Sequence, residues 1–263
     1  MMSMRSASCL LLAMAVASSP AVRAQDPKPK EEPDKEIAEK VELLDEIASD
    51  KKFERDGEGL AVIDFLYQKQ EAGMIEKDQE KVVKALDDLL NKGKVRPHDQ
   101  TQLYEAAAYA LGKFGKEGAK ALKKAYEKKR FPDKTEWVPL REKLLMHLGR
   151  TKDESMVKFL LEEARRSPEA ALQAAAGEAL GNFDDSKEKV RKDIVDELLV
   201  RYGALVEAAS QMGTSIDAQN AQDRLATLSG KWNETLKKLT RQNLDSFAEW
   251  QSWHNKNKNK PWE

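Results

Sequence analysis

Apolar residues recur along this chain at spacings that place them on one side of a helix. Two stretches, 103–114 and 172–183, share matching residues at offsets 0, 4, 7, 8 and 11 from their first leucine. The matched residues are Leu103, Ala107, Ala110, Leu111 and Phe114 in the first stretch and Leu172, Ala176, Ala179, Leu180 and Phe183 in the second. These offsets form one apolar stripe on an α-helix. The chain therefore contains a repeat.

A more degenerate third copy lies between these two stretches. Its stripe positions hold Leu140, Leu144, His147, Leu148 and Thr151. A glycine follows the leucine at offset 8 in every copy, and these glycines, Gly112, Gly149 and Gly181, are 37 and 32 residues apart. That spacing is close to the period of two-helix solenoid repeats. We expect Gly112 and Gly181 to end their helices with a positive φ angle.

The pattern predicts an all-α protein built from pairs of helices. The expected pairs are 101–114 with 116–129, 137–150 with 153–166, and 168–183 with 186–210. One pair cannot bury both sides of its first helix, so successive pairs must stack on one another. The predicted fold is therefore an α-solenoid of stacked antiparallel helix pairs.

The repeat also resembles a known family. The pattern apolar-x-x-A-A-x-A-L-G-x-F followed by a second helix is similar to HEAT repeats, particularly the short bacterial type. The resemblance is clear in 101–130 and 168–202 and weaker in 137–166. It implies a HEAT-like, armadillo-like superhelix, but such repeats carry many functions. Some similar HEAT-like proteins are lyases that attach bilin chromophores, which leaves a lyase-like enzyme or enzyme accessory as one alternative.

The rest of the chain divides where its composition changes. Residues 36–96 predict N-terminal helices and an irregular repeat, with a helix starting after Asp34, a break at 56–59 and a second helix at 60–70. Residues 97–210 hold the regular repeats. Residues 211–263 predict C-terminal helices and a Trp-rich cap.

The N-terminus has the features of an export signal. Residues 1–24 combine Arg5, the short apolar run LLLAMAVA and a small residue, Ala24, at the expected cleavage position. We expect export from a bacterial cell, to the periplasm or the medium. The alternative is a retained N-terminal anchor, although the run is shorter than the ~20 residues that span a bilayer. Residues 25–35, rich in proline and charge, predict a flexible tether.

The net charge and the residue types of the chain do not indicate a catalytic or metal-binding site. The chain has 45 basic and 46 acidic residues, so it has no net basic field to attract nucleic acid. Its one cysteine, Cys9, lies within the predicted signal, and its three histidines are not spaced as metal ligands. We therefore expect no catalytic, cofactor-binding or metal-binding residues. His147 fills a stripe position, which favours a packed core histidine over a catalytic one.

The C-terminal tail offers the clearest candidates for partner contact. The sequence Thr240-Arg-Gln-Asn followed by Trp250-x-x-Trp253 resembles a tail of other exported bacterial HEAT-repeat proteins. Trp250 and Trp253 would lie on one side of a helix. They would either cap the open end of the repeats or form a binding platform for a peptide or glycan.

Three functions fit this sequence. The first is an exported scaffold that binds a protein or peptide partner without catalysis of its own. The second is the lyase-like enzyme or enzyme accessory, which would need a pocket on the solenoid. The third is a structural protein that self-associates through its ends or its Trp-rich tail.

Overall fold

The computed structural model describes residues 32–210 and 216–262. The predicted signal peptide at 1–24 and residues 25–31 of the predicted tether lie outside the described residues. Residues 33–263 belong to one compact unit. The helices of this unit are α1 (Lys35–Ser49), α2 (Asp56–Ala72), α3 (Glu76–Asn91), α4 (Gln102–Leu111), α5 (Gly115–Glu127), α6 (Val138–Arg150), α7 (Val157–Arg166), α8 (Ala170–Leu180), α9 (Glu188–Ser210), α10 (Ile216–Thr240) and α11 (Phe247–Asn257).

Helices account for all regular secondary structure in the described residues. Three short 3-10 helices, η1 (Thr135–Trp137), η2 (Glu154–Met156) and η3 (Gly181–Phe183), join or extend the longer ones, and no strand occurs there. The all-α prediction is confirmed for this part of the chain. The repeat helices lie where the stripes predict them, within a few residues at each end.

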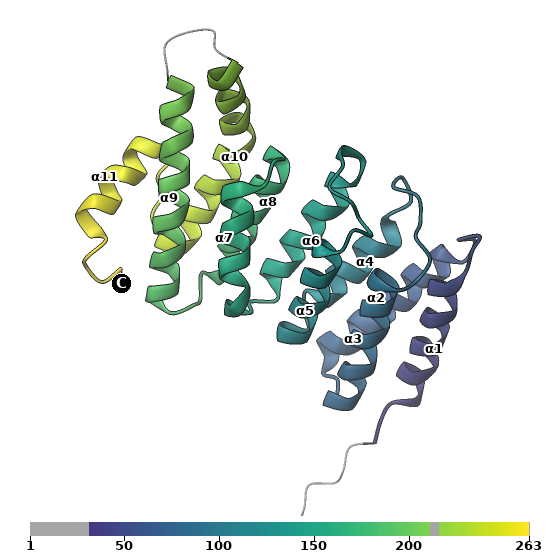
Figure 1. Ribbon diagram of the computed structural model, residues 1–263. Helices are drawn as coiled ribbons and strands as arrows, with labels where there is room; N and C mark the ends of the chain where they lie inside the picture. The colour runs from purple at the N-terminus through teal and green to yellow at the C-terminus, as the bar shows by residue number, and fades with distance from the viewer. Residues whose placement is uncertain (1–31, 211–215, 263) are drawn as a thin grey trace, which may run out of the picture. The chain divides into compact units, whose positions relative to one another are not determined.

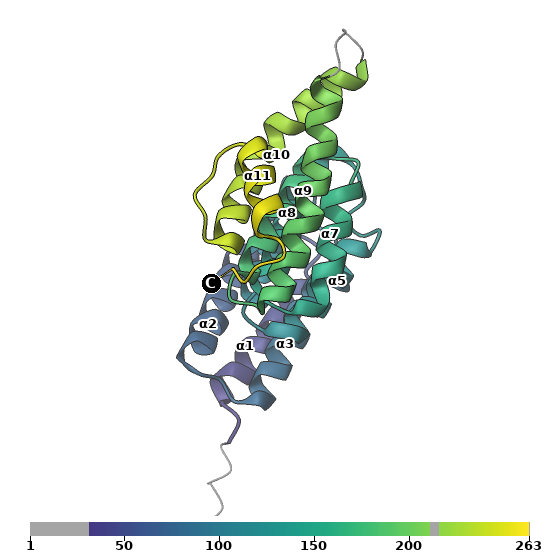
Figure 2. The same ribbon diagram turned by 90° about the vertical axis from the view of Figure 1, so that its left-hand side faces the viewer.

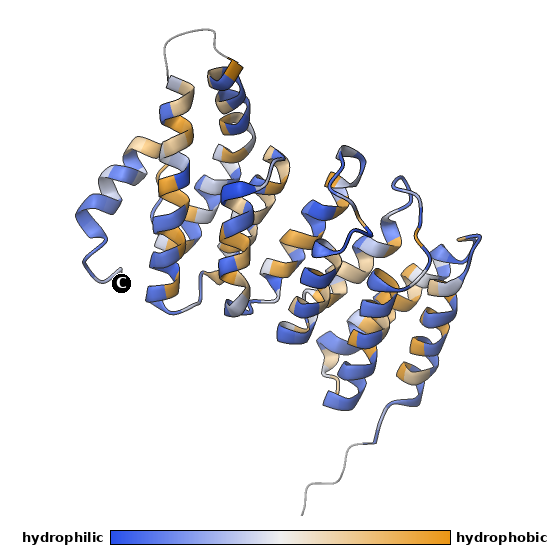
Figure 3. Cartoon of the chain, viewed as in Figure 1, coloured by the Kyte–Doolittle hydropathy of each residue, from blue (hydrophilic) through white to orange (hydrophobic). Residues whose placement is uncertain are grey.

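The helices form two adjoining series (Figure 1). In one series, α2, α4, α6, α8 and α10 each contact the next member. In the other, α1 contacts α3, α3 contacts α5, and α7 contacts α9. The aromatic rings of Tyr126 and Phe159, 5.7 Å apart between their centroids, join α5 to α7. The apolar residues concentrate where the helices meet (Figure 3).

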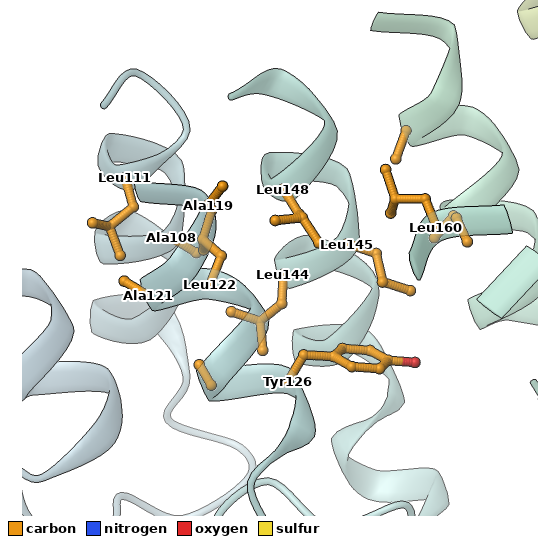
Figure 4. Packing of buried hydrophobic residues seen from close by; sticks show 14 of the residues in the cluster. Ala108, Leu111, Ala119, Ala121, Leu122, Tyr126, Leu144, Leu145, Leu148 and Leu160 are labelled. Atoms are coloured by element: carbon orange, nitrogen blue, oxygen red, sulfur yellow. The ribbon is translucent and has the colours of Figure 1, made fainter. Parts of the chain in front are cut away.

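The buried core follows the sequence stripes. Leu103, Leu111, Leu144, Leu148 and Leu180 are each at most 1% exposed. Leucines from α6 interlock with Leu122 and Tyr126 of α5 on one side (Figure 4). The stripe is therefore the surface through which each helix meets its neighbours.

The repeat glycines do not have the predicted role. Gly112 and Gly181 have φ angles of −57° and −66°, and Gly149 lies inside α6, so the expectation of a positive φ is wrong. Their function is close approach between helices of one series. A Cβ atom on Gly149 would clash with the Ala179 carbonyl oxygen of α8 and lie 2.8 Å from Ala179 Cα. The absent side chain lets the α6 and α8 backbones touch.

The other two repeat glycines also lie at junctions of this series. A Cβ atom on Gly112, after α4, would lie 3.3 Å from the His147 carbonyl oxygen of α6. One on Gly181, after α8, would lie 3.0 Å from Thr235 Oγ1 of α10. The three glycines thus mark the successive junctions of α4, α6, α8 and α10.

The break between the first two helices lies at 50–55 rather than at the predicted 56–59, because residues 56–59 form the first turn of α2. Both oxygens of Asp56 accept hydrogen bonds from the buried Arg96, at 2.6 Å each. A Cβ atom on Gly59 would lie 2.9 Å from Leu103 Cδ1, so this glycine also serves close packing. The two glycines that suggested a turn are therefore part of a helix.

The C-terminal helices extend the packing. Helices α9 and α10 are the longest, and they reach beyond α7 and α8 at one end in both views (Figure 2). Trp232 of α10 is fully buried against Gly177 of α8, and its Nε1 donates to the Gln173 carbonyl oxygen at 3.3 Å. Helix α11 packs on α9.

Replacing Gly149 with alanine tests the role of the close approach. We expect Gly149→Ala to lower the free energy of unfolding by about 1 to 3 kcal/mol, because the clashing atoms belong to the α8 backbone. Gly230→Ala in α10 is the control, since no atom lies within 4 Å of its added Cβ. It should stabilise by about 0.5 to 1 kcal/mol through helix propensity. Urea unfolding that gives both variants the same sign of change would contradict this role.

Candidate binding surface

An exposed tyrosine stands out on the series formed by α2, α4, α6, α8 and α10. Tyr109 of α4 is 42% exposed, although most of its helix is buried. Its ring centroid lies 5.1 Å from that of Tyr67 on α2, and the two hydroxyl oxygens are 3.5 Å apart. The pair forms an aromatic surface that bridges two helices.

Arg150, at the end of α6, covers the other side of this tyrosine. Its guanidinium carbon lies 4.2 Å from the Tyr109 ring centroid, a distance suited to a cation–π interaction. Its Nη1 is 3.3 Å from His147 Nδ1. Hydrogen bonding with Tyr67 and then the contact with Arg150 lower the pKa of Tyr109. These contacts hold the guanidinium in place while leaving its charge without a carboxylate partner among the described residues.

The buried side chain of His147 contacts both Tyr109 and Arg150. It is only 8% exposed, and its ring meets Tyr109 edge-on at 5.4 Å. Arginine can only donate, so Nδ1 accepts and the proton of the neutral ring is on Nε2. Burial, with the charges of Arg150 and Lys143, lowers the pKa of His147 to about 4. This neutral, packed ring agrees with the interpretation of a core histidine that positions Arg150.

The surface continues from α6 to α8 and α10. Met146, Arg150, Glu178, Ala179, Asn182 and Lys238 line a hollow of about 130 Å³. Glu178 pairs with Lys231 of α10 at 2.9 Å. On the α4 side, Lys113 pairs with Glu71 of α2 at 3.1 Å. Arg150 belongs both to the tyrosine pair and to the hollow, so the two form one surface.

Equivalent repeat positions build this surface. Offset 6 from the first leucine of each copy gives Tyr109, Met146 and Glu178, and offset 10 gives Lys113, Arg150 and Asn182. Residues four apart lie on the same side of a helix. Sequence reasoning missed these residues because it followed the apolar stripe. The signal was present in the variable polar positions on either side of the repeat glycine.

The two tail tryptophans differ in exposure. Trp250 is 0% exposed and donates from Nε1 to Asn233 Oδ1 at 3.1 Å, so its ring has no surface for a partner to contact. Trp253 is half-buried between Trp250 and Trp262, at centroid distances of 6.4 and 5.2 Å. Only Trp253 keeps exposed surface, on the side where it lines a shallow hollow with Leu244 and Ala248.

Other charged side chains on the helices have partners in the fold. In α5, Lys124 pairs with Asp87 at 2.6 Å, and Lys120 and Lys123 pair with glutamates of their own helix. His254 of α11 contacts Asp196 of α9 and ties the last helix to the body. Within 32–210 and 216–262, no three His, Cys, Asp or Glu side chains group closely enough to hold a metal ion.

Acid should lower the free energy of unfolding, because His147 is buried in its neutral form. An unperturbed histidine has a pKa of ≈ 6.5, so between pH 7 and 4 the unfolded chain binds a proton that the folded protein resists. The free energy of unfolding that this group contributes above pH 6.5 therefore decreases by about 3 kcal/mol as the pH falls toward 4. We expect His147→Gln to lose correspondingly less stability over this range in urea titrations. Parallel pH profiles of the two proteins would contradict the buried neutral ring.

Alanine substitutions of Trp250 and Trp253 should reduce the free energy of unfolding by different amounts. We expect Trp250→Ala to cost about 3 to 5 kcal/mol, because it empties a fully buried site. Trp253→Ala should cost only about 1 kcal/mol, since its ring is partly exposed. Equal losses in thermal or urea unfolding would mean that the two rings are not divided between core and surface in this way.

Comparison of the chain with protein-family models, curated proteins and solved structures gives no match. In the part of the chain that the structure describes, none of the helices combines the length and the apolar character needed to cross a bilayer. The chemistry of the exposed residues is therefore the basis on which a function can be assigned.

Proposed function

We propose that this protein is an exported scaffold of the HEAT-repeat type that binds a protein or peptide partner and has no catalysis of its own. The partner would lie across α2, α4, α6 and α8. The observation that carries the proposal is the exposed Tyr109 ring stacked against a fixed Arg150 guanidinium.

The helix contacts support a solenoid of stacked antiparallel pairs. Extensive contacts join each helix to its near neighbours in sequence, such as α7 with α8, α6 with α8 and α9 with α10. Repeat glycines recur at the three successive junctions of α4, α6, α8 and α10. A stack of this kind presents equivalent positions of successive repeats in a row, which suits recognition of an extended chain.

The composition of the surface supports binding rather than simple solvation. Tyrosine and arginine are the residue types that contribute most at protein interfaces, because they combine large contact area with directional polar groups. Tyr109 and Arg150 are also held by Tyr67 and His147 before any partner arrives. Such pre-organisation reduces the entropy lost on binding.

Export rests on the sequence of residues 1–24, which combine a basic residue, an apolar run and a small residue at the expected cleavage position. Cleavage after Ala24 would also remove Cys9 and leave a chain without thiols. Such a chain needs no disulfide chemistry in an oxidising compartment. We propose the bacterial periplasm or the medium as the location.

Photo-crosslinking from this surface tests the proposal. The photoreactive residue p-benzoylphenylalanine would replace Tyr109 in one protein and Lys120 of α5, which points to solvent, in the control. After irradiation in an extract of the source cells and medium, we expect a discrete polypeptide adduct at position 109 and none at 120. Adding Arg150→Ala should reduce that adduct, with unchanged helical content by circular dichroism.

Three results would contradict the proposal. They are the absence of any polypeptide adduct at position 109, equal adducts at both positions, and an adduct at 109 that Arg150→Ala leaves unchanged. Each would mean that Tyr109 and Arg150 do not form a selective contact with a polypeptide.

A further inference from the structure

The hollow beside Arg150 carries more positive charge than the rest of the binding surface. It lies between α6, α8 and α10 and has a volume of about 130 Å³. Two cations, Arg150 and Lys238, line it together with a single carboxylate, Glu178. Met146 and Ala179 supply its apolar lining.

The ion pairs of the described residues do not neutralise the two cations of the hollow. Glu178 is already paired with Lys231, which lies outside the hollow, at 2.9 Å. Neither Arg150 nor Lys238 forms an ion pair with a carboxylate among the described residues. The exposed ammonium of Lys238 and the guanidinium of Arg150 therefore line the hollow without an ion pair to Glu178, its one carboxylate.

The guanidinium is placed so that it can still donate. Its carbon lies over the Tyr109 ring, and Nη1 points at His147 Nδ1. Among the described residues, Nε and Nη2 form no hydrogen bond that meets the distance and angle limits, so these in-plane donors can reach a ligand. Asn182 is fixed at the edge by its hydrogen bond to the Ala179 carbonyl oxygen, at 3.0 Å. The geometry suits a carboxylate, which accepts two parallel hydrogen bonds.

We infer that this hollow receives the side-chain carboxylate of an aspartate or glutamate from the polypeptide partner. This inference rests on the proposed function. A partner chain that lies over α4, α6 and α8 projects side chains down onto the helices, and a hollow of about 130 Å³ has room for one such side chain. The carboxylate binds Arg150 and Lys238, and its methylene groups contact Met146 and Ala179.

Short peptides of defined charge test the assignment without knowledge of the natural partner. The probes are acetyl-Ala-Glu-Ala-amide, its Gln counterpart, and acetyl-Ala-Ala-Ala with a free C-terminal carboxylate. The arginine Nε–Hε signals of the full folded protein report binding by NMR, and the Arg150 signal is identified by its loss in Arg150→Lys. We expect the Glu peptide to shift this signal saturably and the Gln peptide to bind roughly tenfold more weakly or not at all.

Variants of the two cations complete the test. Arg150→Gln and Lys238→Gln should each weaken binding of the Glu peptide roughly tenfold or more, and binding should fall as salt is added. Lys152→Gln, at an exposed lysine that is paired with Asp185 and does not line the hollow, should leave it unchanged. Circular dichroism and thermal melting must show that all variants fold.

Four results would overturn the inference. Equal binding of the Glu and Gln peptides would mean that no carboxylate is recognised. Tighter binding of the free C-terminal carboxylate would assign the hollow to a chain end instead. Binding of the Glu peptide that survives both cation variants would place its site elsewhere. A cross-link at position 109 with no peptide response would refute the carboxylate site and leave the proposed scaffold function intact.

Discussion

The close approach of successive helices at their repeat glycines is the constraint on which the rest of this structure depends. At Gly149 the backbone of α6 touches that of α8 so closely that one additional carbon atom would collide with Ala179. Gly112 and Gly181 perform the same task at the neighbouring junctions. At Gly112 and Gly149 the nearest atoms of the next helix belong to its backbone, which cannot rotate away as a side chain can, whereas at Gly181 the nearest atom is the Thr235 hydroxyl oxygen. The backbone contacts hold α4, α6 and α8 at a close spacing. Alanines in the stripe, and Gly177 beneath Trp232, extend this close packing.

A fixed register places equivalent positions of each repeat beside one another. The residues at offsets 6 and 10 lie on either side of the glycine, so tight packing brings Tyr109, Arg150 and the residues of the hollow onto one surface. The leucines at offsets 0 and 8 and the glycine that follows recur in all three copies, whereas these flanking positions vary. The stripe holds the stack together, and we propose that the neighbouring polar positions contact the partner.

Much of the fold could be predicted from the sequence because apolar periodicity reports directly on helices. The stripes located the repeat helices, and the start of α1 after Asp34 was correct. The role of glycine could not be read in the same way, since a chain turn and a close contact both favour it, as Gly59 and Gly149 show. The site was harder still, because contacts such as Arg150 on Tyr109 join residues 41 positions apart in the sequence. The burial of Trp250 likewise depends on Asn233 in another helix.

We propose that the partner covers one series of helices rather than the tail. Hydroxyl-radical footprinting of the protein, alone and with the polypeptide it retains from extracts of its source, measures this directly. Tyrosine, methionine and tryptophan side chains react readily, and Tyr109, Met146 and Trp253 are all at least partly accessible in the free protein. We expect the partner to protect Tyr109 and Met146 from oxidation and to leave Trp253 as reactive as before. Protection of Trp253 with no change at Tyr109 and Met146 would contradict it.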